Sequence, residues 1–357
     1  DVEERGLFFP LNFGAKGSCM IGGNLATNAG GQNVVRYGNT RDLCLGIEAV
    51  TSDGRIINLL SGLRKDNTGY DLRNLLIGSE GTLAIITAAT LKLFHLPKAR
   101  ATAFAVVPDI TRALALLNQA QAETGGAVEA FELIPDVFLE LVKKHAPQYN
   151  IPFKNIPSLS VLVEIAATSN QDGLENEDGV APVNLALEKI LEAGFDQGLI
   201  SDAVIATSET QRRQMWDMRE GALEVITSEG PRIGFDISLP LNRIQDFVEE
   251  MRSKADKIIS GLRMCHMGHL GDGNLHYAIF PPGDKPEILL NKADEIKSVV
   301  YASIGKYGGS FSAEHGIGSS KLSAMSKYKD PVSLAIMKTI KATLDPKNIM
   351  NPGKLLP

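Results

Sequence analysis

The sequence predicts an α+β fold, and three observations lead to this prediction. Its 357 residues suggest two or three domains of about 150 residues each. Residues 14–40 are rich in glycine and asparagine, and short apolar runs follow, so loops and strands are expected to dominate residues 1–97. From residue 98 onward, apolar strands alternate with long amphipathic segments, which predicts a second and more helical part of the chain.

The composition is that of an ordinary globular protein, with 44% hydrophobic and 22% charged residues. A net charge of −6 argues against a nucleic-acid partner, which would need a basic surface to neutralise phosphates. Cys19, Cys44 and Cys265 are scattered, which argues against a disulfide framework and favours a reducing compartment. Without an apolar run of about 18 residues or a signal-peptide pattern, the expected location is the cytoplasm or the mitochondrial matrix.

The first part of the chain shows two strand patterns. Residues 45–60 predict a β-hairpin, because two apolar runs flank the turn pair Asp53-Gly54. The glycine loop "GSEGT" at 78–82 then leads into an apolar, β-branched run that predicts a further strand. Pro97 closes this block.

The second part begins with the order β-α-β-β-α-β over residues 101–207. This order predicts a ferredoxin-like unit with an antiparallel sheet and helices on one face. Its first helix has Asp109 as N-cap and Gly125 just past its end. Further helices are predicted over 209–227, 241–261 and 286–309, and a strand over 233–240. An amphipathic segment and a proline-punctuated tail end the chain.

Three of the six histidines lie in "MCHMGHLGDGNLH" at 264–276. Gly271 and Gly273 argue against a helix, so we expect a tight turn that folds the strand back and brings His269 and His276 together. Neutral imidazole suits zinc and similar divalent metals, and two histidines with one carboxylate are a known catalytic zinc set. Glu314 could supply the carboxylate.

Glu314 and His315 are neighbours in "SAEHGIG". Adjacent residues of an extended chain point apart, so one would bind the metal while the other serves as acid or base. A single histidine is otherwise most often a hydrogen-bonded core residue, and we assign His266 and His95 to this class. We expect His145 at a solvated helix end, and Asp272 in a turn.

The glycine block "IGGNLATNAGG" at 21–31 leaves backbone N–H groups unobstructed, which suits the binding of phosphate oxygens. Arg36 adds a cation, and "GSEGT" is a second glycine loop whose backbone a ligand could approach closely. Neither a GxGxxG after a strand nor a Walker lysine is present. These residues alone predict a nucleotide or flavin site.

Six stretches together resemble the FAD-linked D-2-hydroxyacid dehydrogenases, a family of D-2-hydroxyglutarate and flavin-dependent D-lactate dehydrogenases. They are "GAKGSCMIGGNLATNAGG", "RYG", "LRKDNTGYDLRNLLIGSEGTLAIIT", "CHMGHLGDGNLH", "SAEHGIG" and "LDPKNIMNPGK". The resemblance implies the second half of a PCMH-type FAD-binding domain in 1–97. It further implies a substrate- and metal-binding domain of the FAD-linked oxidase type in 98–325, and a C-terminal helix and loop in 326–357 that return to the flavin domain.

The resemblance also implies roles for individual residues. The residues that would line FAD are Gly22, Gly23, Asn24, Thr27, Asn28, Gly30, Gly31, Gly81, Ile85, Ile86 and Asn351. His269, His276 and Glu314 match ligands of zinc or manganese. His315 matches the catalytic base, and Arg219 matches an arginine that binds the substrate carboxylate.

The activity implied is oxidation of a D-2-hydroxy acid to the 2-oxo acid, with hydride transfer from C2 to the flavin. The electrons would pass on to a quinone, a cytochrome or an electron-transfer flavoprotein, and the resemblance is also consistent with a homodimer.

Two departures from the family pattern shape these expectations. The first pyrophosphate loop of the type "PRGGGT" is absent, so we expect this chain alone to hold FAD poorly. Leu223, Gly234 and Ala278 stand where D-2-hydroxyglutarate enzymes carry threonine, lysine and asparagine, although Arg232 could supply charge. We therefore expect a smaller or more apolar D-2-hydroxy acid as substrate.

Two other functions remain open. A non-catalytic subunit of a 2-hydroxyacid oxidase would explain the missing flavin loop, but the complete set His269, His276, Glu314 and His315 argues against it. A metal-dependent hydrolase would use the same metal ligands, but the flavin-loop matches argue against that function.

Overall fold

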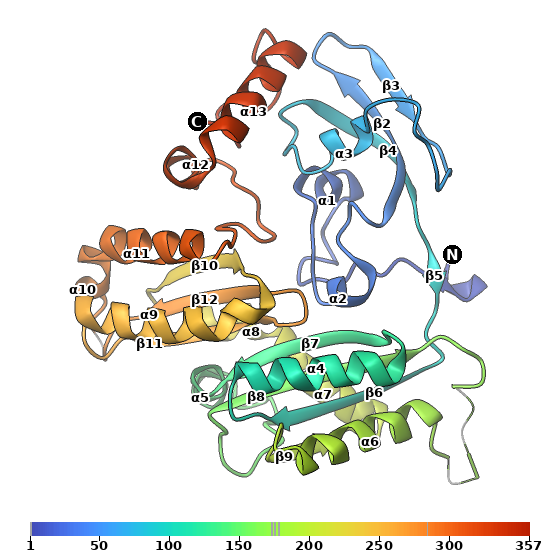
Figure 1. Cartoon of the computed structure of the whole chain (residues 1–357), viewed down its shortest axis with the longest axis vertical. Coiled ribbons are helices and arrows are strands. Elements are labelled where there is room, and N and C mark those ends of the chain that lie inside the picture. Colours follow the sequence, from blue (N-terminus) through green and yellow to red (C-terminus); the bar gives the residue numbers. More distant parts are fainter. Residues whose placement is uncertain (1, 173, 175, 178, 284) are drawn as a thin grey trace. The chain divides into compact units, whose positions relative to one another are not determined.

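The computed structural model describes residues 2–172, 174, 176–177, 179–283 and 285–357 (Figure 1). Its contacts divide the chain into unit 1, Asp1–His95 with Ser312–Pro357, and unit 2, Leu96–Phe311. Residues 312–325, expected with the second part of the chain, therefore belong to unit 1. A contact between distant parts of the chain holds them there: the Glu80 carboxylate accepts hydrogen bonds from the backbone N–H groups of Ile317 at 2.7 Å and Gly318 at 2.8 Å.

Unit 1 contains a three-stranded antiparallel sheet of order β3-β2-β4 and the short pair β1-β5. Its elements are η1 (Glu3–Arg5), β1 (Leu7–Phe8), α1 (Ile21–Thr27), α2 (Val34–Tyr37), β2 (Cys44–Thr51), β3 (Ile56–Leu59), α3 (Leu72–Leu76), β4 (Ala84–Leu91), β5 (Phe94–His95), α12 (Leu322–Tyr328) and α13 (Pro331–Leu344). The expected hairpin is β2-β3, with Gly54 at a φ of +83° in its turn. The apolar sides of α1, α3 and this sheet form the small core of the unit.

Unit 2 is built on a seven-stranded antiparallel sheet of order β10-β12-β11-β7-β8-β6-β9. Its elements are β6 (Ala99–Val106), α4 (Ile110–Thr124), β7 (Val128–Pro135), α5 (Asp136–His145), β8 (Leu159–Ala167), α6 (Pro182–Asp196), β9 (Asp202–Ile205), α7 (Glu209–Glu220), α8 (Ala222–Ser228), β10 (Ile233–Ser238), η2 (Leu241–Arg243), α9 (Ile244–Ile258), β11 (Arg263–His269), β12 (Asn274–Phe280), α10 (Pro286–Asn291) and α11 (Ala293–Lys306). The strands of the expected ferredoxin-like unit are β6 to β9. The capping of α4 is also confirmed, with Asp109 accepting from the N–H of Arg112 at 2.8 Å and Gly125 in the left-handed region.

Helices cover both faces of this sheet rather than one. α4, α6, α9 and α11 contribute to a large core on one face, as Figure 1 shows for α4 and α6 over β6 to β8. α5, α7 and α8 form a second core on the other face. α5 was predicted only at its end, His145, and one helix was predicted where α7 and α8 meet at Gly221. Among the described residues, no helix combines the length and apolarity needed to span a bilayer.

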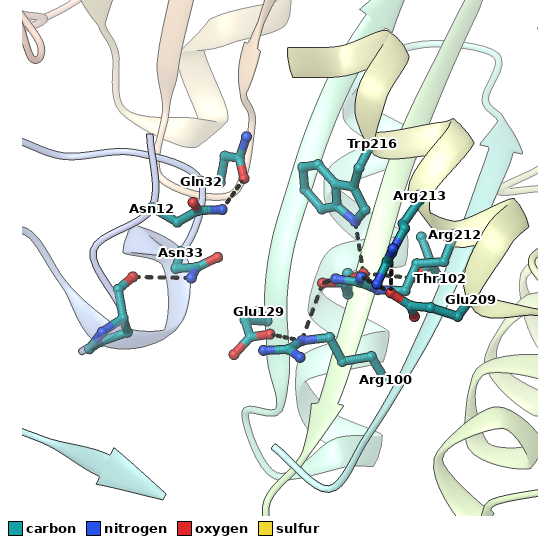
Figure 2. A network of polar contacts seen from close by, with 12 residues as sticks. Asn12, Gln32, Asn33, Arg100, Thr102, Glu129, Glu209, Arg212, Arg213 and Trp216 are labelled. Atoms are coloured by element: carbon teal, nitrogen blue, oxygen red, sulfur yellow. Dashed lines mark hydrogen bonds and ion pairs between the residues drawn. The ribbon is translucent and has the colours of Figure 1, made fainter. Parts of the chain in front are cut away.

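A buried carboxylate fixes α7 against the second face of the sheet. Glu164 on β8 accepts hydrogen bonds from Thr102 Oγ1 at 2.6 Å, Trp216 Nε1 at 2.8 Å and Arg212 Nε at 2.7 Å. Figure 2 shows these three side chains converging from β6 and α7. A buried carboxylate needs such partners because its desolvation is costly. Both the position and the rotation of α7 are therefore set by polar contacts as well as by apolar packing.

A second buried carboxylate, Glu229, joins the end of α8 to α5 and β11. It accepts from Lys144 Nζ at 2.8 Å, contacts His145 Nε2 at 2.6 Å and pairs with Arg263. The predicted place of His145 at a helix end is confirmed, because α5 ends at this residue. Its predicted solvation was wrong, because the side chain is only 20% exposed and contacts Glu229. Burial alone would raise the pKa of Glu229, but the hydrogen bonds from His145, Lys144 and Arg263 outweigh it and lower the pKa to about 2.

Replacing Glu229 with glutamine should lower the free energy of unfolding at pH 7 by about 1–3 kcal/mol, because Lys144, His145 and Arg263 lose the negative charge and one of the two acceptor oxygens. The folded-state pKa lies below the ordinary 4.5, so the stabilisation is complete above pH 4.5 and disappears as pH falls toward 2. We would measure the free energy of unfolding by urea at several pH values. The proteins compared are wild type, Glu229→Gln and Glu224→Gln, a control at an exposed site. If the difference in the free energy of unfolding between wild type and Glu229→Gln is as large at pH 2 as at pH 7, the charge of Glu229 is not the cause of the stabilisation.

Candidate metal and catalytic site

The hairpin β11-β12 carries the two central histidines. Residues 270–273 join its strands, and Gly273 adopts a φ of +85° where a Cβ would lie 2.4 Å from the carbonyl oxygen of Leu239. The Asp272 carboxylate accepts from the backbone N–H of Asn274 at 3.0 Å. The expected tight turn and the turn role of Asp272 are both confirmed, and a residue with a side chain could not replace Gly273 without a backbone shift.

The turn brings the rings of His269 and His276 together on one face of the sheet. Their ring centroids lie 5.2 Å apart with an interplanar angle of 82°. His276 on β12 pairs with Met267 on β11, so their side chains lie on the same face of the sheet. His269 follows Met267 by two residues along β11, and the alternation of a strand places it on that face as well. His269 is buried and His276 is half-buried, so unit 2 presents two convergent imidazoles.

The ring of His269 is held by Glu132 on the neighbouring strand β7. Its Nδ1 lies 2.6 Å from Glu132 Oε1, while Arg219 Nε donates to Glu132 Oε2 at 2.7 Å. Burial alone would raise the pKa of the Glu132 carboxyl, but Arg219 and His269 outweigh it and lower the pKa to about 2. Because a carboxylate only accepts, Nδ1 of His269 carries the proton and Nε2 keeps its lone pair.

His276 has a more open setting. Its Nδ1 lies 3.9 Å from the carboxylate of Asp236, which is an ion-pair distance rather than a hydrogen bond. Burial is the main cause that lowers the pKa of His276, and the neighbouring His269 and Arg219 add to it. The ring is therefore neutral at pH 7, which is the form that binds a metal.

Glu314 and His315 lie on a loop of unit 1. Ser312 Oγ donates to the carbonyl of Gly316 at 2.5 Å, and Glu80 binds the following backbone N–H groups. A Cβ on Gly30 would lie 2.7 Å from Glu314 Oε1, so the carboxylate lies directly against the glycine block. His315 is exposed. Within unit 1, the acidic and basic candidates thus adjoin the predicted cofactor loop.

The two glycine-rich segments of unit 1 are bonded to each other. The N–H of Gly78 donates to the carbonyl of Leu25 at 2.9 Å, and that of Glu80 to Ala26 at 2.8 Å. Gly22 lies against β4, where a Cβ would be 3.3 Å from the carbonyl oxygen of Ile86. Segments far apart in the sequence therefore form one surface of backbone groups.

The candidate flavin residues differ in exposure. Exposed or half-exposed are Gly22, Gly23, Thr27, Asn28, Gly81, Ile85, Ile86 and Asn351; buried are Asn24, Gly30 and Gly31. Asn24 Nδ2 bonds Cys19 Sγ at 3.4 Å and Asn28 Oδ1 accepts from the N–H of Arg41 at 2.9 Å, so both side chains also hold the loop. Asn351 donates to the carbonyl of Glu80, next to Gly81. The C-terminal tail thus joins the same surface.

The remaining candidates are spread over both units. Arg219 is 6% exposed, whereas Arg232 is half-buried and donates to Thr227 Oγ1 at 3.2 Å. His266 is confirmed as a core residue, and burial lowers its pKa to about 4. The assignment of His95 to the core was wrong, because it is exposed on β5.

Three functional carboxylates were not predicted from the sequence: Glu132, Asp236 and Glu80. Glu132 could have been noticed because it is a carboxylate within the apolar strand "VEAFELIP", whose residues are all buried in the structure.

Comparison with known proteins identifies the fold and the family. The family model described as FAD linked oxidases, C-terminal domain, matches residues 96–355, and that described as FAD binding domain matches residues 1–60. Two solved structures resemble the chain at the level of fold. They are p-cresol methylhydroxylase with substrate bound, at TM-score 0.70, 14% identity and coverage of 99% of this chain and 72% of that one, and an alkyldihydroxyacetonephosphate synthase, at TM-score 0.63, 17% identity and coverage of 98% and 60%.

Curated relatives are similar over nearly the whole chain. The mitochondrial D-2-hydroxyglutarate dehydrogenase of Rattus norvegicus is 39% identical over 100% of this chain and 63% of its own length, and that of Bos taurus is 38% identical over 100% and 62%. The D-2-hydroxyglutarate dehydrogenase of Xanthomonas citri pv. viticola is 36% identical over 99% of this chain and 72% of its own length. The chain thus spans less than two thirds of the two mitochondrial relatives. These matches show that the chain belongs to the family of FAD linked oxidases.

Proposed function

We propose that this protein is an FAD- and metal-dependent dehydrogenase that oxidises a D-2-hydroxy acid to the 2-oxo acid. The observation that carries the proposal is the pair His269 and His276, whose rings converge in a chain of the FAD linked oxidase family. The relatives described as D-2-hydroxyglutarate dehydrogenases support a 2-hydroxy acid as the substrate class.

The proposed metal ligands are His269, His276 and Glu314, with zinc or manganese as the ion. The donor set fits such an ion, because two neutral imidazoles and a carboxylate are common ligands of both. Ser310 exchanges backbone hydrogen bonds with Ser238 on β10, at 2.8 and 3.0 Å. Glu314 follows Ser310 by four residues, a reach of at most about 14 Å. This short connection supports Glu314 as the third ligand.

The proposed cofactor surface is the one formed by the "NLATNAGG" and "GSEGT" segments. Their exposed backbone and the exposed side chains of Thr27 and Ile85 fit a group that carries phosphates and a flat ring system. When bound, FAD would accept the hydride from C2, and the metal would hold the hydroxyl and carboxylate oxygens of the substrate.

The chain's own residues supply the proton chemistry and the binding of the acid. His315 takes the hydroxyl proton onto a ring nitrogen as the C–H bond breaks and the carbonyl forms. Arg219 keeps N–H donors beyond those that Glu132 accepts, and these would bind the substrate carboxylate. The fixed positions of these groups lower the entropic cost of reaching the reactive arrangement.

The substrate side chain is proposed to be apolar or small. Gly234 and Ala278 pair across β10 and β12, and a Cβ on Gly234 would meet no atom within 4 Å. Leu223 is 73% exposed on α8. These positions offer space and apolar surface, and Arg232, the residue that could supply charge beside Gly234, donates to Thr227 Oγ1 instead. A second carboxylate left unpaired on burial would cost several kcal/mol (about 3–5).

Anaerobic mixing of the FAD-loaded protein with a panel of D-2-hydroxy acids tests this function. We expect the visible flavin band to bleach with D-2-hydroxy acids and not with their L-enantiomers, and to bleach faster with D-lactate or longer apolar acids than with D-2-hydroxyglutarate. A flavin that none of the D-acids reduces would overturn the proposed activity, whereas fastest bleaching by D-2-hydroxyglutarate would overturn only the proposed side-chain preference.

A further inference from the structure

We propose that Glu132 is a positioning residue of the metal site, one that fixes the ring of His269 so that Nε2 is available to the metal. Arg219 balances the charge of this carboxylate inside the core. The inference deepens the proposed function and rests on it, because His269 is a ligand only if the site binds a metal.

The position of Glu132 follows from the β-ladder. Glu132 on β7 pairs directly with His269 on β11. Directly paired residues of an antiparallel ladder have side chains next to each other on the same face. The sheet itself therefore sets the contact between the carboxylate and the imidazole, which is 2.6 Å between Oε1 and Nδ1.

The two oxygens of the carboxylate have different partners. Oε1 faces Nδ1 of His269, whereas Oε2 faces Arg219, with Nε at 2.7 Å and Nη2 at 2.6 Å. The Glu132 side chain is fully buried, so water cannot substitute for either partner. The carboxylate consequently has little freedom to rotate away from His269.

Arg219 is itself held through α7. Arg212, Trp216 and Arg219 are spaced at i, i+4 and i+7, and thus lie on one face of that helix. Arg212 and Trp216 bind Glu164 on β8, the strand next to β7. Two carboxylates on neighbouring strands therefore fix the face of α7 that carries Arg219, and Arg219 in turn fixes Glu132.

The carboxylate paired with the second histidine across the ladder is that of Asp236. Asp236 approaches His276 Nδ1 only to 3.9 Å, which exceeds hydrogen-bond distance. A ligand whose second nitrogen is bound to a carboxylate has a defined tautomer and orientation, and removal of such a partner typically lowers metal affinity about 10–100-fold. The geometry thus assigns the orienting role to Glu132.

The test uses the full chain with Glu132→Gln, Glu132→Asp and the matched control Glu129→Gln. Glu129 lies on the same strand, is equally buried and pairs with Arg100 Nε at 2.8 Å, as Figure 2 shows. Zn²⁺ affinity is measured by competition with a chromophoric chelator, and the tautomer of His269 in the metal-free protein by ¹⁵N NMR of the imidazoles. Glu132→Asp retains the charge beside Arg219, so it remains informative if Glu132→Gln does not fold.

The expected result is about 10–100-fold weaker Zn²⁺ binding in both Glu132 variants, loss of the Nδ1–H tautomer preference, and less than about a twofold change in Glu129→Gln. Unchanged affinity in the Glu132 variants, or an equal loss in the control, would overturn the positioning role while leaving the metal site intact. A wild-type protein that binds no Zn²⁺ would instead overturn the proposed metal site, and this inference with it.

Discussion

Replacing His315 with glutamine is expected to reduce kcat by about 10²–10⁴-fold, the contribution of one general base. Glutamine is close to histidine in size and polarity but cannot accept the hydroxyl proton. The effect should appear in kcat with little change in Zn²⁺ affinity, because His269, His276 and Glu314 remain. We would measure kcat by steady-state kinetics on the D-2-hydroxy acid that bleaches the flavin fastest. Competition with a chelator gives the Zn²⁺ affinity.

His95→Gln is the control for this variant. His95 is an exposed histidine of the same unit, on β5, and has no proposed part in the reaction. The variant His95→Gln should leave kcat within about twofold of wild type, since substitutions at the surface, away from buried or catalytic groups, have small effects. If His315→Gln retains more than a tenth of the wild-type kcat, another group takes the proton.

The features that the sequence predicted correctly depend on short-range signals. The N-cap Asp109, the hairpin turn at Gly54 and the turn at Gly273 follow from local conformational preferences of single residues. The pairing of His269 with His276 is of the same kind, because one tight turn separates the two strands. The approach of these two histidines therefore follows from the local sequence, without contacts from the rest of the fold.

The features that the sequence did not reveal depend on distant contacts. Glu132 is 137 residues from His269, and only the β7-β11 pairing brings them together. Likewise, residues 312–325 belong to unit 1 through Glu80, which is more than 230 residues away. The solvation predicted for His145 was wrong because its partner Glu229 is 84 residues away, at the end of another helix.

A second large effect is expected from His276→Ala, which should weaken Zn²⁺ binding by more than about 10²-fold, beyond the typical effect of losing an outer partner. His276 is neutral at pH 7 because burial lowers its pKa, so the wild-type ring binds the metal without first releasing a proton. Removing it leaves one imidazole and one carboxylate, which are too few ligands for a stable zinc or manganese site.

The matched control for this prediction is His266→Phe. His266 lies on β11 opposite Tyr277, and its odd spacing from His269 places it on the other face of the sheet. It is also neutral at pH 7, since burial lowers its pKa to about 4. His266→Phe should alter the free energy of unfolding and leave the Zn²⁺ dissociation constant within about twofold of wild type. If instead His266→Phe weakens Zn²⁺ binding as much as His276→Ala does, the loss reflects the packing of the β11-β12 hairpin, and His276 would lose its place as a ligand.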